Sequence, residues 1–310
     1  MNTNIKTIKR PNLFIVGASK CGTTALYNYL RLHPKIYFCD IKEPKYFGSD
    51  LPFKSDRYGN KLERYLELFI HAGKHKIIGE ASTNYLYSKK AAFEIKKFNP
   101  NAKIIIMLRN PVDQIYSRYS QLFSLGIESL LNFEDALKIE KHRKKLSKKN
   151  KYIRLLLYRN IANYYEQVKR YYDLFGKNKI HIIIFDDFIK DTAEVYKKVL
   201  DFLKIDNSYR PDFIKLNTNR VQNKNKIPRI WIFEKILYKQ PKFIMNLANK
   251  NKYISKLGMY LYLLITKYNH KYKERKPMTT KLRNQLKKEF TPDIKKLEVL
   301  TQKDLSGWYK

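Results

Sequence analysis

The stretch FIVGASKCGTTAL, residues 14–26, has the residue types and spacing of a phosphate-binding loop. An apolar run leads into a loop bounded by Gly17 and Gly22, and a helical pattern follows. Such a loop points backbone N–H groups at a helix N-terminus, where the helix dipole also favours an anion. The hydroxyls of Thr23 and Thr24 add donors, and Lys20 adds a full positive charge.

The lysine of this loop stands in a different place from the lysine of an ATP site. A Walker A loop reads G-x-x-x-x-G-K-[ST], whereas here Thr23 follows the second glycine and Lys20 lies inside the loop. The stretch therefore lacks the Lys-Ser/Thr pair that places Mg²⁺ beside a γ-phosphate. It predicts a site for one terminal phosphate and a leaving group, without a metal. An ordinary βα turn rich in small residues is the alternative.

A second candidate anion ligand is Arg109, at the end of the apolar run KIIIMLR. Asn110 can cap a following helix and Pro111 suits its first position, so Ser117 lies about two turns along that helix. Ligands of open α/β sheets bind at the carboxyl ends of the strands. We therefore expect Arg109 to bind an anion beside the first loop; a plain surface charge is the alternative.

Short apolar runs alternate with helical patterns along the chain. Buried strands are expected at residues 12–17, 75–80, 103–109 and 180–188, with helical patterns at 23–34, 91–98 and 160–175. Strands that alternate with helices favour an α/β fold with a P-loop-like parallel sheet and helices on both faces. In the first of these helices, Leu26, Tyr29 and Leu30 share the face expected to be buried.

The last stretch and one basic run give weaker patterns. Residues 278–300 are expected to form two amphipathic helices broken near Pro292, with Thr279 or Thr280 capping the first. The basic run at residues 141–151 is typical of a solvated loop or helix face.

The composition is that of a globular and strongly basic protein. The chain has 310 residues, 44% of them hydrophobic, and we expect one domain over residues 1–310. Lys+Arg 64 against Asp+Glu 28 gives a net charge of +36, which suggests an anionic partner such as nucleic acid, an acidic membrane surface or an acidic glycan. A biased genome would give the same excess without a function. The basic, aromatic region 227–275 is interpreted as a helical cap over the cleft, or as an acceptor or membrane-surface face.

Location is inferred from the cysteines and the apolar runs. Cys21 and Cys39 form no disulfide framework, which fits a reducing compartment. No apolar run stands behind the basic N-terminal residues before the first strand, so no signal peptide is expected. The longest candidate membrane run, residues 257–266, is too short to span a bilayer. We expect a cytoplasmic protein, with peripheral contact at the inner membrane face left open.

Several stretches, taken in order, resemble one enzyme family. GASKCGTTAL resembles the 5′-phosphosulfate loop of sulfotransferases that use 3′-phosphoadenosine 5′-phosphosulfate (PAPS), and LRNPVDQIYSRYSQ resembles their 3′-phosphate motif. DIKEPKYF, residues 40–47, resembles the lysine-glutamate segment of the Golgi heparan sulfate enzymes and their bacterial relatives. IGEASTNYLYS resembles their E-K-[TS]-x-x-Y segment, and the ending resembles their C-terminal helices and D-L-S-x-W. The resemblance runs from about residue 12 to residue 310.

The resemblance implies how the donor would be held, with no metal required. Lys20 matches the lysine that contacts the bridging oxygen of the leaving phosphate, and Arg109 and Ser117 match the groups that hold the 3′-phosphate. Lys224 and Lys226, in NKNKIPR, match a basic loop in which the family has a glycine where Asn225 stands. The implied donor-binding residues are Ser19, Lys20, Cys21, Gly22, Thr23, Thr24, Ala25, Arg109, Ser117, Lys224 and Lys226.

Glu43 matches the family's general base, which would take a proton from the acceptor hydroxyl or amine. We expect Pro44 to hold Glu43 in an extended conformation that points it into the cleft. A surface glutamate among lysines is the alternative. His33 is a rival base, but its place at a helix end favours a structural role; His71 and His75 are weaker rivals. Ala81 departs from the family, which has a lysine there, and this puts a heparan-type acceptor in doubt.

The sequence thus predicts a sulfotransferase that moves a sulfuryl group from PAPS to a carbohydrate, a glycolipid or a small hydroxylated acceptor by in-line displacement. Peripheral contact with an anionic membrane or an acidic glycan stays open. One alternative is a P-loop kinase or other nucleotide phosphotransferase, with Asp186 as a Walker B-like carboxylate. The other is a non-enzymatic anion- or nucleic-acid-binding protein, which no helix-turn-helix or finger spacing supports, and we expect no nucleic acid partner.

Overall fold

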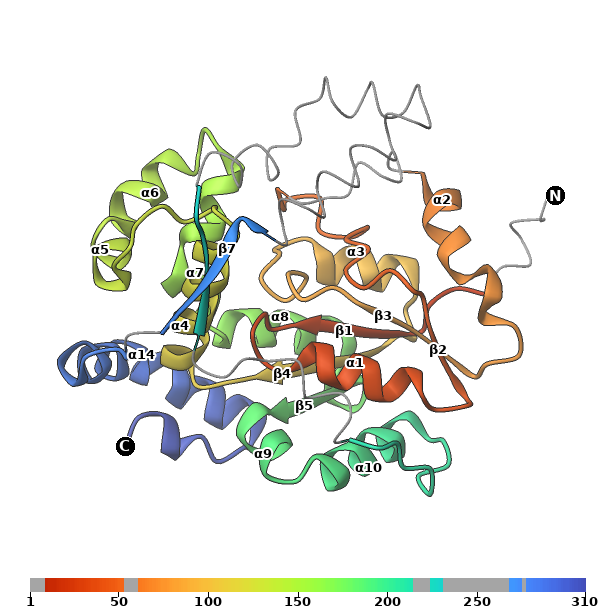
Figure 1. Cartoon of the computed structure of the whole chain (residues 1–310). Helices are drawn as coiled ribbons and strands as arrows, with labels where there is room; N and C mark the ends of the chain where they lie inside the picture. The colour runs from red at the N-terminus through yellow and green to blue at the C-terminus, as the bar shows by residue number, and fades with distance from the viewer. Residues whose placement is uncertain (1–8, 53–60, 214–223, 231–267, 275–276) are drawn as a thin grey trace, which may run out of the picture. The chain divides into compact units, whose positions relative to one another are not determined.

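The computed structural model describes residues 9–52, 61–213, 224–230, 268–274 and 277–310 (Figure 1). Their contacts divide the chain into two compact units. The first unit falls within Met1–Gln114, Arg159–Asn219 and Asn284–Lys310, and the second within Ile115–Tyr158 and Arg220–Arg283. That residues 1–310 act as one domain stays a prediction.

The first unit contains a parallel sheet of five strands in the order β2-β3-β1-β4-β5. Its strands are β1 (Leu13–Gly17), β2 (Ile36–Phe38), β3 (Ile77–Ala81), β4 (Lys103–Leu108) and β5 (Ile180–Ile184). Nearly all of their side chains are buried, as expected of apolar runs covered on both faces. The predicted parallel sheet is confirmed, whereas the short strand β2 was missed because three residues carry no period.

Helices line both faces of this sheet, as predicted (Figure 1). They include α1 (Thr23–Arg31), α2 (Leu62–Leu66), α3 (Ala91–Phe98), α8 (Tyr165–Phe175), α9 (Phe185–Lys190) and α10 (Thr192–Leu203), with the 3₁₀ turns η3 (Glu67–Ala72) and η5 (Lys177–Lys179). In α1, Leu26, Tyr29 and Leu30 are fully buried, as predicted. The predicted strand at 180–188 is too long, because the chain turns into α9 at Phe185.

The C-terminal stretch corrects one prediction. It forms a single helix, α14 (Thr280–Thr301), with Pro292 inside it, followed by the 3₁₀ turn η6 (Ser306–Trp308). The helix continues because its buried face, with Phe290 before the proline and Ile294 after it, is uninterrupted. Thr279 caps the helix, as predicted, since its Oγ1 accepts from Leu282 N at 3.3 Å.

The second unit carries short helices and a two-stranded antiparallel sheet. Its elements are α4 (Pro111–Ser124) from Ile115 on, α5 (Phe133–Lys138), α6 (Glu140–Leu146), η4 (Lys151–Leu156), β6 (Lys224–Pro228) and β7 (His270–Glu274). The helix α7 (Tyr158–Ala162) starts at Tyr158, the last residue of this unit's first segment. In the basic run at 141–151, the lysines of α6 are exposed as predicted. Arg143 is buried, however, because its guanidinium donates to Glu128 at 2.7 and 2.8 Å.

Most of the basic region 227–275 lies outside the described residues, and so does the apolar run at 257–266. In the part of the chain that the structure describes, no helix is long and apolar enough to cross a membrane. The roles considered for this region, and the cytoplasmic location, stay predictions.

Candidate functional site

The sheet order places the carboxyl end of β1 between the carboxyl ends of β3 and β4. The chain leaves β1 toward β2 and β3 on one side and reaches β4 on the other. This reversal of direction is the place where open α/β sheets bind ligands. The segments that follow β1, β3 and β4 therefore bound the candidate site, and all three belong to the first unit.

The loop after β1 is fixed at both ends. Ala18 N donates to Met107 O on β4 at 2.7 Å, and Gly22 caps α1. Ala25 N and Leu26 N both donate hydrogen bonds to Gly22 O, at 2.9 and 3.2 Å. The N–H groups that precede them stand at the open end of α1, where a helix offers its donors to an anion.

Gly22 and Gly17 meet neighbours that leave no room for a side chain. Gly22 has φ 87°, and an added Cβ would lie 3.0 Å from the ring of Phe185. An added Cβ at Gly17 would lie 2.9 Å from Thr83 O and closer still to Leu86. The loop is thus packed against the segment after β3 at its start and against α9 at its end, which gives it a defined shape.

Arg109, directly after β4, lies beside this loop. Its Nη1 is 3.4 Å from Lys20 O, and its guanidinium carbon lies 4.7 Å from the centroid of the Phe185 ring. The structure therefore brings two predicted anion ligands, Lys20 and Arg109, to the same end of the sheet. Lys20 itself has φ 68°, in the left-handed region.

Gln114 is a residue of the site that the sequence reasoning missed. Its side chain is fully buried on the first turn of α4, and its Nε2 donates to Ser19 O at 3.0 Å. Gln114 thus ties the loop to the helix that follows Arg109. The signal that could have found it is its position four residues after Asn110, one helical turn on from the predicted cap.

Cys21 and Ala25 have limited freedom to contact a ligand. The Cys21 side chain is fully buried, with Sγ 3.6 Å from Ser19 O and 3.9 Å from Tyr164 Oη, and burial raises the pKa of its thiol to about 12. Cys21 can therefore face a ligand only through its backbone. The N–H of Ala25 is already used by Gly22 O.

Glu43 lies on the other side of the loop, held by the segment after β3. Its Oε1 accepts from Thr83 Oγ1 at 2.7 Å, from Thr83 N at 3.3 Å and from Lys42 Nζ at 3.2 Å. Its side chain is 23% exposed. The carboxylate is therefore fixed in direction and still open to solvent, unlike a free surface glutamate.

The expected extended conformation of Glu43 is wrong. Its φ is 63°, and Lys45 also has a positive φ, 57°. The preference imposed by Pro44 is overridden because Glu43 N donates to Ala81 O at 3.0 Å while the carboxylate is held by Thr83. Ala81, which stands where the resembling enzymes have a lysine, is buried at the end of β3.

Three of the residues predicted to bind the donor lie in the second unit. Ser117 is half-buried on α4, eight residues after Arg109. Lys224 and Lys226 lie on β6, where their backbones pair with Glu274 and Tyr272 of β7. Their part in the site stays a prediction.

Three of the rival residues make hydrogen bonds to the fold, whereas His71 is exposed. His33 is buried, with Nδ1 accepting from Lys35 N at 3.0 Å and Nε2 at 3.1 Å from Asp206 O, which makes Nε2–H the donor. His75 contacts Ala72 O through Nδ1 at 2.6 Å. Asp186 lies on α9 and accepts from Trp308 Nε1 at 3.0 Å, so it is not the strand-end carboxylate of a Walker B motif.

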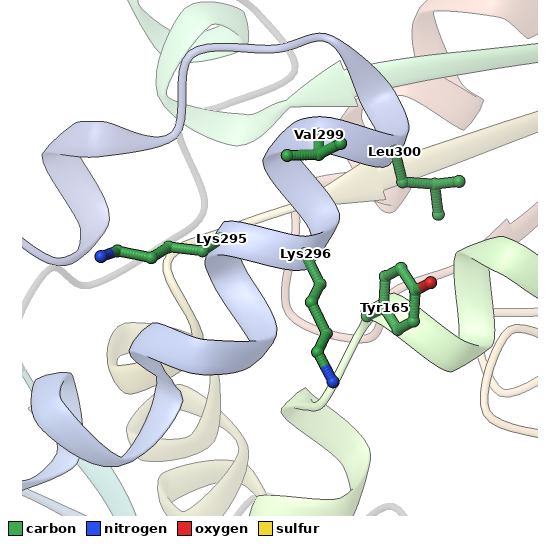
Figure 2. Close-up of a pocket in the computed structure, with 5 residues that line it drawn as sticks. All are labelled: Tyr165, Lys295, Lys296, Val299 and Leu300. Atoms are coloured by element: carbon green, nitrogen blue, oxygen red, sulfur yellow. The ribbon is translucent and has the colours of Figure 1, made fainter.

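A shallow pocket of about 400 Å³ lies elsewhere on the first unit, between α14 and the start of α8. It is lined by Tyr165, Lys295, Lys296, Val299 and Leu300 (Figure 2). Figure 2 shows Lys296 beside Tyr165, while Lys295 points away. The Nζ of Lys296 lies 5.8 Å from the centroid of the Tyr165 ring. None of these residues was a predicted site residue.

Comparison with known proteins gives one consistent family. The family model described as "Sulfotransferase domain" matches residues 10–307. The crystal structure of a sulfotransferase from Alicyclobacillus acidocaldarius is 30% identical, covers 98% of this chain and 100% of its own, and superposes with a TM-score of 0.72.

Two animal proteins are similar over shorter stretches. Human carbohydrate sulfotransferase 15 is 36% identical over 149 residues, covering 35% of this chain and 27% of the human protein. Mouse bifunctional heparan sulfate N-deacetylase/N-sulfotransferase 4 is 33% identical over 125 residues, covering 40% of this chain and 14% of the mouse protein. The chain thus spans about a quarter or less of the length of these two relatives.

The family model covers nearly the whole chain, and the bacterial structure agrees with it over its full length. The predicted family and enzyme class are therefore confirmed. The chain belongs to the sulfotransferase domain family, a family of transferases.

Proposed function

We propose that this protein transfers a sulfuryl group from PAPS to a hydroxyl or amine of a carbohydrate-type acceptor by in-line displacement. The observation that carries the proposal is the position of Arg109, whose Nη1 lies 3.4 Å from Lys20 O, beside the loop that opens helix α1. Family membership supports the reaction class.

The donor set fits a phosphosulfate bearing a second phosphate. The helix α1 N-terminus offers backbone N–H groups and the Thr23 and Thr24 hydroxyls, Lys20 adds a positive charge, and the Arg109 guanidinium is held beside the loop by Lys20 O. PAPS would supply the activated sulfuryl group and leave as adenosine 3′,5′-bisphosphate. The residues proposed to hold it are Ser19, Lys20, Cys21, Gly22, Thr23, Thr24, Ala25, Arg109, Ser117, Lys224 and Lys226.

Each cation has a separate role in the proposal. Lys20 stabilises the negative charge that develops on the bridging oxygen, a task that a preorganised cation performs without reorganisation. Arg109 and Ser117 hold the 3′-phosphate, for which the planar guanidinium is suited. Lys224 and Lys226 add positive charge.

Glu43 is the proposed general base. All of its side-chain hydrogen bonds within the described residues end on Oε1, so Oε2 is the oxygen presented to the acceptor proton. A carboxylate held in one direction and partly open to solvent suits this task.

The proposed acceptor class is a carbohydrate, since the similar animal proteins are named for carbohydrate and heparan sulfate. The net charge of +36 favours an acidic glycan among carbohydrates. A glycolipid or a small hydroxylated compound fits the same chemistry. The proposal includes peripheral contact with an anionic membrane, since a similar protein of Dictyostelium discoideum, 35% identical over 114 residues and with 23% of its length covered, is named a membrane-associated sulfotransferase.

Calorimetric titration tests the donor site. We expect adenosine 3′,5′-bisphosphate to bind without magnesium and ATP not to bind. ATP binding that requires Mg²⁺, without bisphosphate binding, would instead support a kinase. Transfer of ³⁵S from labelled PAPS to desulfated heparan sulfate, chondroitin, glycolipids and small phenols then assigns the acceptor.

A further inference from the structure

Glu80 is the most deeply buried carboxyl group near the proposed base, and the reaction described above gives it no role. It lies on β3, next to Ala81, and its side chain is fully buried. Among the described residues, no lysine or arginine pairs with it. A buried carboxylate without a cation is costly, so its hydrogen bonds show what it holds in place.

Two hydroxyl groups beside Glu80 connect it to the segment that carries Glu43. Lys45 N donates to Ser82 Oγ at 3.1 Å, and Ser82 Oγ donates to Glu80 Oε1 at 2.8 Å. Phe47 N donates to Tyr85 Oη at 3.1 Å, and the Tyr85 hydroxyl lies close enough to the Glu80 carboxyl to lower its pKa. Both hydroxyls accept from a backbone N–H, and that of Ser82 donates in turn to Glu80.

A third contact reaches the same segment through an aromatic ring. Tyr65, on α2, donates its hydroxyl to Glu80 Oε2, and its ring stacks on Tyr46 with centroids 4.3 Å apart. Three consecutive residues, Lys45, Tyr46 and Phe47, are therefore tied to one carboxylate. The segment needs such an anchor, because Glu43 and Lys45 both adopt positive φ.

We propose that Glu80 is a positioning residue: its carboxylate, through Ser82, Tyr85 and Tyr65, fixes residues 45–47 and so holds Glu43 in its reactive place. The inference rests on the proposed function, since it concerns the placement of the proposed base. Glu80 touches neither donor nor acceptor in this proposal.

The state of charge of Glu80 decides how well it can do this. The carboxylate accepts from the Ser82 hydroxyl on one oxygen and from the Tyr65 hydroxyl on the other, whereas a protonated carboxyl must donate one hydrogen bond and loses an acceptor site. Burial raises the pKa of Glu80 to about 7, and the nearby Glu43 charge acts in the same direction. Contacts with the Tyr65, Tyr85 and Ser82 hydroxyls lower the pKa and partly offset this rise. Cys39 and Tyr171 also interact electrostatically with Glu80, and neither carries a positive charge that would lower its pKa. The anchor is therefore complete above neutral pH and weakens below it.

Amide hydrogen exchange resolved to single residues tests the anchor without any ligand. In Glu80→Gln, we expect the amides of Lys45 and Phe47 to exchange about tenfold faster, since charge-assisted hydrogen bonds are lost. Ser82→Ala should release Lys45 alone, and Tyr85→Phe should release Phe47 alone. If both amides exchange at the wild-type rate in Glu80→Gln, the proposal is overturned. If Glu80→Gln does not fold, unchanged exchange in both Ser82→Ala and Tyr85→Phe overturns it.

Glu94 offers a matched control. Its carboxylate accepts from Gly48 N at 2.6 Å and from Ser49 N at 3.3 Å, directly after the anchored segment. Glu94→Gln should release Gly48 and Ser49 and leave Lys45 and Phe47 protected. Equal release of Lys45 and Phe47 by the two variants would mean a general loosening, which contradicts the specific role of Glu80.

The pH profile and turnover separate positioning from a merely structural role. Between pH 8 and pH 6, the wild-type protection factors at Lys45 and Phe47 should fall, while those of Glu80→Gln stay constant. Glu80→Gln should bind adenosine 3′,5′-bisphosphate with unchanged affinity. Its rate of bisphosphate release from PAPS, with desulfated heparan sulfate as the acceptor, should fall at least tenfold. Its thermal midpoint at pH 8 should be no lower than that of the wild type, because a buried charge is removed. Wild-type turnover in this variant overturns the proposal.

The two proposals fail in different ways. If the wild-type protein neither binds the bisphosphate nor releases it from PAPS, the proposed function fails. The exchange measurements then still decide whether Glu80 anchors residues 45–47. If donor binding and turnover are normal and Glu80→Gln changes neither turnover nor exchange, only the role of Glu80 is lost.

Discussion

Thr83 Oγ1 donates to Glu43 Oε1 across 2.7 Å, and Thr83 N donates to the same oxygen at 3.3 Å. Thr83, two residues past the end of β3, thus orients the proposed base. Because Oε1 is occupied, the Oε2 lone pairs have a defined direction. This relationship predicts that the base and its threonine act together.

Glu43→Gln should lower sulfuryl transfer at least about 100-fold, because an amide cannot take the acceptor proton. The affinity for adenosine 3′,5′-bisphosphate and the thermal midpoint should stay within error of the wild type. Thr83→Val, which keeps the shape and removes the hydroxyl, should lower transfer by about tenfold. Initial rates with ³⁵S-labelled PAPS measure both. Near-normal turnover of Glu43→Gln would end the assignment of the base.

Lys20→Ala should abolish turnover while the fold is kept. The hydrogen bonds of Ala18, Gly22 and Gln114 hold the loop and remain in this variant, so circular dichroism and the thermal midpoint should change little. Loss of a preorganised charge at the leaving group costs about 100- to 1,000-fold in rate. Single-turnover transfer from bound PAPS gives the rate of the chemical step. A rate within tenfold of the wild type would contradict the assigned contact with the bridging oxygen.

The sequence predicted the sheet and the first loop well, and for a physical reason. Apolar runs such as KIIIML are buried on both faces of the sheet, so local composition alone specifies them. The strand order β2-β3-β1-β4-β5, which brings Arg109 to Lys20, has no local signal in the sequence; the general rule on strand ends predicted only that Arg109 binds an anion there.

What the sequence could not predict depends on contacts between distant residues. The left-handed backbone of Glu43 follows from Ala81 and Thr83, about forty residues away, and no local preference indicates it. The buried Gln114 resembles any polar residue of a helix until the fold places Ser19 next to it. Arg143 likewise lies in a lysine-rich run that is typical of a solvated face, and its burial depends on Glu128, which accepts from its guanidinium.

Arg109→Ala should chiefly weaken donor binding. The bisphosphate affinity should fall about 10- to 100-fold, the range for loss of a charge-assisted contact to phosphate. Arg109→Lys should be intermediate, since it keeps the charge and loses the planar fork. Arg31→Ala is the matched control, because Arg31 is exposed and pairs with Asp40 at 2.6 Å, and it should bind normally. Calorimetry that finds unchanged affinity for Arg109→Ala would rule out this role.

Neither cysteine should react in the folded protein. Burial raises the pKa of both thiols, Cys21 and Cys39, to about 12, and both side chains are buried. At pH 8 the thiolate that reacts with iodoacetamide is therefore nearly absent. Mass spectrometry should find no alkylation of native protein and two alkylations after unfolding in guanidinium. Labelling of Cys21 in the native protein would mean that the loop opens to solvent.

Pro292→Ala should stabilise the protein. Pro292 lies inside α14 and cannot donate to the carbonyl of Lys288, yet the helix continues. It continues because both sides of the proline are held: Ile294 is fully buried, and Asp293 Oδ2 accepts from Tyr164 N at 2.8 Å.

Alanine restores the missing N–H without disturbing those contacts. The gain should be about 1 kcal/mol in the free energy of unfolding, less than the roughly 3 kcal/mol difference in helix propensity, because proline also restricts the unfolded chain. Urea unfolding monitored by fluorescence measures it, with the exposed Lys288→Ala as the control. A lower free energy of unfolding in Pro292→Ala would show that the proline bends α14 into a shape that the Asp293 contact requires.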